Sequence, residues 1–167
     1  PSVSANVEAE IAALLPSAEI VRLAGATRMQ TAELVYKELG ASASKTAVIA
    51  RSMDFPDSLS VSSWAAHTQS PIFLTDFAET GLTQGTLDAL ASGGFERILV
   101  LGSELSVPAS VVSQALAATG LADSDAIRLG GIDRVDTSVK IAEWATDPSR
   151  GTEQLSYDKL AITRSDS

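Results

Sequence analysis

Short apolar runs alternate with longer stretches of helical periodicity along this chain of 167 residues. The runs are nearly continuously apolar, which favours parallel strands covered on both faces over strands with one solvent-exposed face. The predicted strands lie at 19–23, 46–51, 72–75, 97–101, 126–129 and 159–163.

Between these runs, apolar residues recur at helical spacing. One stripe consists of Val7, Ile11, Leu14 and Leu15, a second of Ala32, Val35, Tyr36 and Leu39, and a third of Leu87, Leu90 and Ala91. Thr83 is the expected N-cap of the third helix, and Pro108 suits the first turn of a fourth. Strict alternation of strands and helices predicts right-handed crossovers and a three-layer α/β fold with a parallel, doubly wound sheet, Rossmann-like or toprim-like.

The sequence also contains an internal repeat. The segment Arg-Leu-Ala-Gly-Ala-Thr-Arg-Met-Gln-Thr at 22–31 recurs as Arg-Leu-Gly-Gly-Ile-Asp-Arg-Val-Asp-Thr at 128–137. Val3, Ala5 and Val7 recur as Val107, Ala109 and Val111, and residues 49–52 recur at 162–165. We therefore divide the chain into the tail of a preceding repeat (1–18), one complete repeat (19–124) and the first part of the next (125–167).

Charge and composition narrow the classes of partner. The chain carries 21 acidic and 12 basic residues, for a formal net charge of −9. Such a charge disfavours nonspecific binding to nucleic acid or to anionic membranes. No apolar run approaches the roughly 18 residues of a membrane span, and without cysteine the chain has neither disulfides nor thiolate metal sites. The usual nucleotide-binding and hydrolase motifs of α/β proteins are also missing from the sequence.

Several polar residues have a structural interpretation. Thr27 with Gln30 forms a capping-box pattern, and Asp133 with Asp136 repeats it in the later copy. The single histidine, His67, is expected near the end of a helix, at the surface and not as a catalytic base.

Three aspartates follow the ends of predicted strands, where α/β proteins bind ligands. Asp54, Asp57 and Asp76 could in principle hold a hard cation through their carboxylates. Asp57, which follows Pro56, also fits the N-cap of the next helix. We favour capping over metal binding for Asp57, and no cofactor is expected.

Arginines are repeated in pairs. Arg22 matches Arg128, Arg28 matches Arg134, and Arg51 matches Arg164. A residue directly after the N-cap Thr27 or Asp133 lies at the positive end of the helix dipole, which costs a cation about 0.3–1 kcal/mol. Either a nearby carboxylate or an anionic ligand group is expected to compensate, and the sequence leaves both open.

These motifs resemble the cell-wall-binding repeat type 2 family of Gram-positive surface proteins. The family pattern Arg-Leu-x-Gly-x-x-Arg-x-x-Thr is met at 22–31 and again at 128–137. Phe-Pro-Asp-x-Leu follows at 55–59, and Pro-Ile-x-Leu-Thr at 71–75. Met29 and Val135 stand where the family usually has an aromatic residue, and Gly102-Ser103 replaces its usual Gly-Gly.

The resemblance implies a non-enzymatic, extracellular module that holds its parent protein on the cell wall. Its ligand would be an anionic secondary wall polysaccharide, bound by tandem copies that pack together. The residues expected to bind it are Arg22, Arg28, Arg51, Asp57, Thr75, Asp76, Arg128 and Arg134. Strand 159–163 lacks a following helix, so contact with a neighbouring repeat or a second copy of the chain is also expected.

Two alternatives stay open at this point. The chain could be an α/β enzyme or receptor for a small phosphorylated ligand, bound at the strand ends that carry Arg51, Asp54 and Asp76. It could also serve chiefly to pack one module against another.

Overall fold

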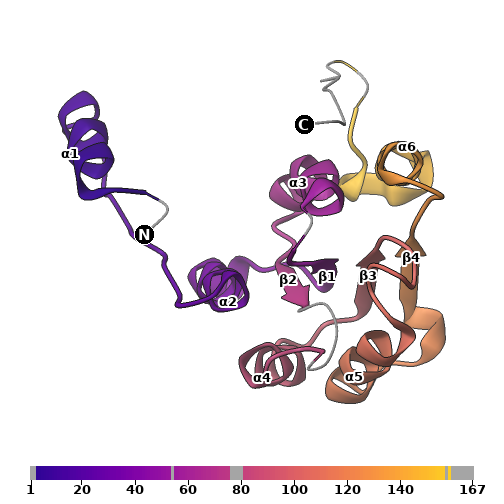
Figure 1. Cartoon of the computed structure of the whole chain (residues 1–167). Coiled ribbons are helices and arrows are strands. Elements are labelled where there is room, and N and C mark those ends of the chain that lie inside the picture. Colours follow the sequence, from indigo (N-terminus) through magenta and orange to yellow (C-terminus); the bar gives the residue numbers. More distant parts are fainter. Residues whose placement is uncertain (1–2, 54, 76–80, 157, 159–167) are drawn as a thin grey trace.

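The fold is built on a sheet of four parallel strands. The computed structural model describes residues 3–53, 55–75, 81–156 and 158. Its strands are Thr46–Arg51 (β1), Ile72–Thr75 (β2), Arg97–Leu101 (β3) and Ala126–Leu129 (β4), in the spatial order β2-β1-β3-β4 (Figure 1). The chain therefore winds outward from β1 in both directions, which confirms the predicted doubly wound parallel sheet.

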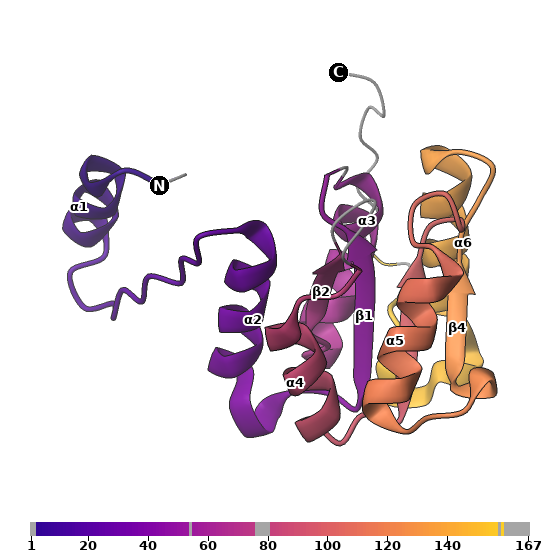
Figure 2. The ribbon, with the colours of Figure 1, turned by 60° about the horizontal axis from the view of Figure 1, so that its bottom comes forward.

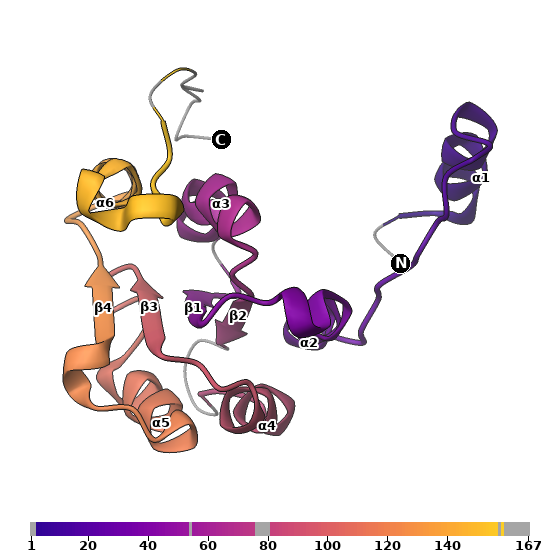
Figure 3. The same cartoon turned by 180° about the vertical axis from the view of Figure 1, so that it is seen from behind.

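Helices cover both faces of this sheet. Pro56–Thr68 (α3) and Arg134–Thr146 (α6) pack side by side on one face, and Gln84–Ser92 (α4) and Ala109–Thr119 (α5) on the other (Figure 3). Arg28–Leu39 (α2) lies along the β2 edge, whereas Ala5–Leu14 (α1) stands away from the sheet at the end of an extended segment (Figure 2). Short 3-10 helices are formed by Gly40–Ser42, Asp123–Asp125 and Pro148–Glu153.

The core explains why the strand sequences are apolar without alternation. Residues 47–50 of β1 are completely buried. Ala47 and Ile49 pack into the cluster beneath α4 and α5, while Val48 and Ala50 pack into the cluster beneath α3 and α6. Because successive strand residues point to opposite faces, a strand covered on both sides needs an apolar side chain at every position.

One predicted strand does not form. Residues 19–23 are extended but belong to no sheet, and Ile20 and Val21 are 39% and 54% exposed. Their counterpart in the repeat, β4, pairs with β3, whose other edge is bonded to β1. A strand needs a partner edge as well as strand-forming residues, and both edges of β3 are already taken. The predicted strand at 159–163 lies outside the described residues.

Both helices of the Arg-Leu-x-Gly repeat begin with a variant of the predicted capping box, in which the side chain three residues after the N-cap accepts from the amide just before the N-cap. In α2, Thr27 Oγ1 accepts a hydrogen bond from Gln30 N (3.2 Å), and Gln30 Oε1 accepts one from Ala26 N (2.9 Å). In α6, Asp136 N donates to Asp133 Oδ1 (2.8 Å), and the Asp136 carboxylate accepts from Ile132 N (2.9 Å). The predicted N-caps and the structural role of these four residues are confirmed, whereas the returning bond reaches one residue further back than a capping box requires.

The two capping boxes should respond differently to acid. The hydrogen bond from the Ile132 amide and that from the Lys140 side chain lower the pKa of Asp136. A lowered pKa in the folded state means that the bonds stabilise α6 above the ordinary aspartate pKa of about 3.9 and are lost as pH falls through the lower folded value. As the pH falls through the folded pKa of Asp136, which lies below the ordinary value of about 3.9, the protection of the Ile132 amide relative to its intrinsic exchange rate at the same pH should fall more than that of Ala26, whose partner Gln30 does not titrate. Hydrogen exchange followed by NMR measures this, and an equal loss of protection at the two amides would contradict it.

The other helix starts agree with expectation to within one residue. Thr83 caps α4 and accepts from Thr86 N (3.1 Å), as predicted. Pro108 is the N-cap of α5, one position before the predicted first turn. The prediction for Asp57 is wrong by two positions, because Phe55 is the N-cap of α3 and Pro56 takes the first helical position that suits a proline. Asp57 lies in the first turn instead.

Candidate functional site

Arginines meet at the carboxyl edge of the sheet, where β1 ends and α2 begins. Arg51 is the last residue of β1. Arg28, the first residue of α2, donates from Nη1 to the carbonyl oxygen of Ser52 (2.8 Å). This bond fixes the start of α2 beside the end of β1 and brings together two arginines that are 23 positions apart in the sequence.

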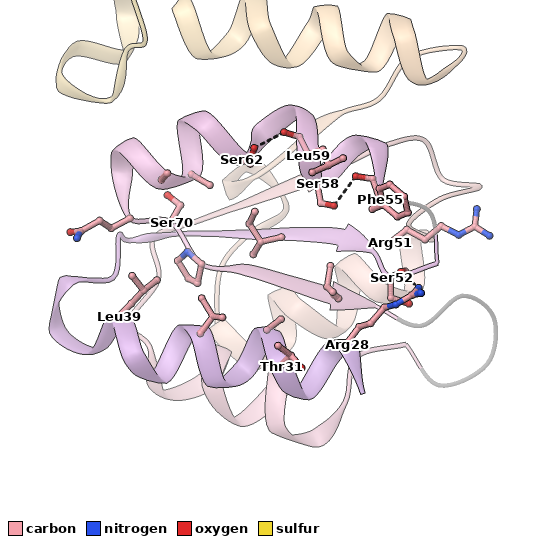
Figure 4. Close-up of a pocket in the computed structure, with 18 residues that line it drawn as sticks. Arg28, Thr31, Leu39, Arg51, Ser52, Phe55, Ser58, Leu59, Ser62 and Ser70 are labelled. Carbon is pink, nitrogen blue, oxygen red and sulfur yellow. Dashed lines mark hydrogen bonds between the residues drawn. The ribbon is translucent and has the colours of Figure 1, made fainter. Parts of the chain in front are cut away.

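A groove of about 780 Å³ runs from these arginines along the β2 edge, between α2 and α3. Arg28, Arg51 and Phe55 lie at one end of it, and Leu39 lies toward the other (Figure 4). The remaining apolar residues that line it are Ala32, Val35, Leu59, Ala65, Ala66, Pro71, Ile72 and Leu74. We call this surface the α2–α3 groove; it is an apolar trough with a basic end.

Arg28 is held by a partner that the sequence did not predict. Its position at the start of α2 places a cation at the positive end of the helix dipole. A backbone carbonyl compensates, where a carboxylate or an anionic ligand had been expected. A guanidinium carries five N–H donors, and the bond to Ser52 engages Nη1, so Arg28 can still bind an anion at this exposed edge.

Arg22 and Arg128, which match in the repeat, lie in different surroundings. Arg22, on the extended segment before α2, forms an ion pair with Glu8 and donates to the Val3 carbonyl (3.0 Å). Arg128 in β4 donates to the Gly102 carbonyl (2.9 Å). Partial burial lowers the pKa of Arg128, and the nearby Glu104 carboxylate offsets part of this effect. Neither lines the α2–α3 groove.

Three of the remaining predicted residues, Thr75, Asp57 and Arg134, belong to different elements of the described structure. Thr75, at the end of β2, is buried, and its hydroxyl donates to the Gly81 carbonyl (3.0 Å), which gives it a structural role. Arg134 begins α6 and Asp57 lies in the first turn of α3. Asp76 and the candidate cation ligand Asp54 lie outside the described residues. Whether any of these residues binds the polymer stays a prediction.

Gly102 leaves room for the Asp57 carboxylate, which a side chain at position 102 would meet. It adopts φ +89°, and a Cβ atom there would lie 2.7 Å from Asp57 Oδ2 and 2.8 Å from Ser106 Cβ. Gly102→Ala should therefore destabilise the chain by about 1–3 kcal/mol through backbone strain and displacement of the carboxylate. Gly120→Ala is the matched control, because Gly120 has φ +74° but nothing within 4 Å of its Cβ position. Denaturant unfolding compares them, and an equal loss in both variants would contradict the steric role of Asp57.

His67 lies in the last turn of α3, where its Nε2 is 3.1 Å from the Thr152 carbonyl oxygen. This matches the predicted place at a helix end. Among the described residues, no group of three or more histidine or carboxylate side chains could hold a metal ion, and no helix is long and apolar enough to cross a bilayer.

Sequence reasoning missed the α2–α3 groove. It assigned Val35 and Leu39 to one apolar helical stripe and Leu59 only to the Phe-Pro-Asp-x-Leu motif, yet all three line the groove, where Leu59 is 61% exposed and Val35 43%. The strand β2 carried a signal, since Ile72 and Leu74 are apolar but lie on a face that α3 and α2 leave partly open. These apolar residues would have indicated a groove only if the sequence had shown that β2 is an edge strand of the sheet.

Comparison with known proteins places this geometry in context. Residues 22–112 match the model of the family described as cell wall binding domain 2. Among solved structures, Cwp6 from Clostridium difficile aligns at 27% identity over 77% of this chain, with a TM-score of 0.66. Cwp8 from the same organism aligns at 25% identity over 86%, with a TM-score of 0.70. This chain spans 20% of the first and 22% of the second. A comparison with curated protein sequences returned no match.

Proposed function

Because the chain belongs to the cell wall binding domain 2 family, we propose that it attaches the protein that carries it to the cell wall by binding an anionic wall polysaccharide. The family and the two Cwp neighbours support cell wall binding itself. The attachment is noncovalent and non-enzymatic, and it acts outside the cell, at the bacterial surface.

The observation that carries the proposal is the pair of arginines at the end of the α2–α3 groove. Arg28 and Arg51 present two permanently charged side chains at the edge of a protein whose net charge is −9. An acidic protein and an anionic polymer repel each other overall, so binding requires local basic sites of this kind. Charged hydrogen bonds from guanidinium groups to carboxylates or phosphates are short and directional, which suits this role.

Repetition of the site along the array strengthens the attachment. Arg134 opens α6 in the later copy of the motif, as Arg28 opens α2. Once one site holds a long polymer, a second linked site binds at a high effective concentration. Individually weak contacts therefore produce firm retention.

A sedimentation assay tests the proposal directly. The purified chain is mixed with isolated Gram-positive cell walls and with the same walls after chemical removal of their anionic polymer. We expect the chain to pellet with intact walls and to stay in the supernatant with stripped walls, and retention to fall with added salt because ionic contacts are screened. Equal retention on intact and stripped walls would contradict polymer binding.

A further inference from the structure

Two large apolar side chains stand in solvent at the carboxyl edge of the sheet. Phe55, the N-cap of α3, is 64% exposed, and Ile132, in the turn before α6, is 95% exposed. Single exposed apolar residues are common on protein surfaces and need no explanation. These two differ because each lies beside an arginine of the proposed site, on a backbone that local contacts hold in place.

At Phe55 the backbone is fixed by the start of α3. Its carbonyl oxygen accepts a hydrogen bond from Leu59 N (2.9 Å), and Pro56 follows with its restricted φ. The side chain lies with Arg28 and Arg51 at the basic end of the α2–α3 groove (Figure 4). The fold therefore holds an aromatic ring in solvent next to two guanidinium groups.

At Ile132 the backbone is fixed by the start of α6. Ile132 N donates to the Asp136 carboxylate (2.9 Å), and Gly131 N donates to Thr137 Oγ1 (2.9 Å). A Cβ atom on Gly131 would lie 2.5 Å from Asp136 Oδ2 and from Thr137 N, so the turn lies tight against the helix. Arg134, the first residue of α6, comes two positions later. Here too a fixed backbone exposes an apolar side chain beside an arginine.

The first copy of the repeat shows that exposure at this position is a property of the turn. The counterpart of Ile132 is Ala26, whose amide donates to Gln30 Oε1 (2.9 Å). Ala26 is exposed, although α2 packs on β2 through Tyr36 and on α4 through Glu33. The position therefore stays open on a helix that is packed against a sheet, and in the second copy it carries a larger apolar side chain.

The starts of α2, α3 and α6 follow one another along the carboxyl edge. Helices that connect parallel strands run antiparallel to them, so each begins at this edge. The α2–α3 groove separates the first two helices, and α3 and α6 pack side by side (Figure 3). Four exposed residues thus lie at three neighbouring helix starts, and we call them the helix-start row: Arg28, Phe55, Ile132 and Arg134.

The carboxylates at the start of α6 are engaged within their own turn. Asp133 Oδ1 accepts a hydrogen bond from Asp136 N (2.8 Å). The Asp136 carboxylate pairs with Lys140 (3.2 Å), which offsets its charge. An anion that approaches Ile132 and Arg134 therefore meets less repulsion than the number of acidic residues suggests.

We propose that the helix-start row binds the wall polymer through its sugar rings as well as through its charges. Phe55 and Ile132 pack against C–H faces of the rings, while Arg28 and Arg134 bind the anionic groups. This inference rests on the proposed function and adds the class of ligand that the site selects, an acidic or phosphorylated polysaccharide over a polyanion without rings.

The chemistry of the two kinds of side chain gives the reason for this selection. A guanidinium binds the carboxylates or phosphates of any polyanion, so arginines alone do not recognise a sugar. A pyranose ring has faces of C–H groups, and contact between such a face and an apolar side chain removes apolar surface from water. An aromatic ring adds area at little cost in conformational freedom, which favours Phe55 as the stronger contact.

The wall sedimentation assay tests the proposal with Phe55→Ala, Ile132→Ala and the double variant. Ile132→Ala introduces the residue that the first copy carries in the same turn, so the fold should be kept. Each single change should lower retention on intact walls by about threefold to fivefold, and the double change by at least about tenfold, because apolar burial is lost. Phe55→Tyr, which keeps the ring, should lose less than Phe55→Ala.

Salt and a polyanion without rings separate the apolar contacts from the ionic ones. The double variant should lose the same factor in retention at low and high salt, because added salt screens charges and leaves apolar contacts in place. Arg28→Ala should instead make retention less dependent on salt. Binding of the chain to inorganic polyphosphate should be equal for the double variant and the native sequence.

Leu105→Ala is the matched control. Leu105 is 84% exposed at the same edge of the sheet, but its loop leads to α5 on the other face and it follows the acidic Glu104. Its replacement removes exposed apolar surface outside the row, so retention on walls should be unchanged.

The outcomes distinguish this inference from the proposed function. Native retention by the double variant, folded as judged by circular dichroism, would overturn the inference and leave wall binding in place, as would an equal loss on walls and on polyphosphate. A loss on untreated walls with normal retention on protease-treated walls would assign Phe55 and Ile132 to a protein partner and also overturn it. Equal retention of the native chain on intact and stripped walls would overturn the proposed function itself.

Discussion

A Trp64→Ala chain is expected to lose about 3–5 kcal/mol of unfolding free energy, the usual cost of truncating a buried aromatic side chain. Trp64 is 1% exposed in the centre of α3, and its indole Nε1 donates to the Glu153 carbonyl (2.9 Å). Its ring packs edge to face on Trp144 of α6 (centroids 4.8 Å apart). The substitution removes apolar contacts, leaves a cavity between α3 and α6, and deprives Glu153 of a donor.

Urea unfolding followed by circular dichroism measures this loss. Phe55→Ala is the control, because Phe55 is also aromatic but is 64% exposed beside α3, and its loss should stay below about 1 kcal/mol. A Trp64/Trp144 double-mutant cycle should show a coupling of about 0.5–1.5 kcal/mol for the ring pair. A Trp64→Ala loss no larger than that of Phe55→Ala would show that α6 does not pack on α3 in solution.

The second large effect is expected for wall binding. Arg28→Ala should weaken retention on intact walls by about tenfold or more, as expected for loss of a charged hydrogen bond, and Arg134→Ala should do the same. The double change should be worse than either, because each removal reduces the number of linked sites. Retention is measured as the fraction of chain that pellets with walls over a range of salt concentrations.

Arg97→Ala is the matched control for charge. Arg97 begins β3 at the opposite, amino edge of the sheet and pairs with Glu153 (3.1 Å). Its replacement changes the net charge as Arg28→Ala does but leaves the proposed site intact, so retention should be nearly unchanged. Unaltered retention by the double variant at both low and high salt would exclude Arg28 and Arg134 from the site. Unfolding of that variant would instead favour a purely structural role for these arginines.

The sequence by itself determined the four strands of the sheet, most of the helices and the class of fold. Continuous apolar runs such as 46–51 require cover on both faces, and their alternation with helical stripes leads to a doubly wound parallel sheet. The helix starts at Thr27 and Asp133 could be predicted because a capping box involves residues within a few positions of one another. The repeat and the family motifs are likewise properties of the linear order of residues.

Only the tertiary structure decided which segments find a partner. Residues 19–23 and β4 share a sequence motif, but one is exposed and the other lies in the sheet, because pairing depends on which edge of β3 is available. Likewise Val35 and Ile141 hold the same place in the repeat, but Val35 is 43% exposed and Ile141 only 1%. The difference arises because Ile141 packs against α3, whereas Val35 lines the open groove. The carbonyl that holds Arg28 belongs to Ser52, 24 positions away. Contacts of this kind depend on distances that the chain sets only after it has folded, and no local pattern encodes them.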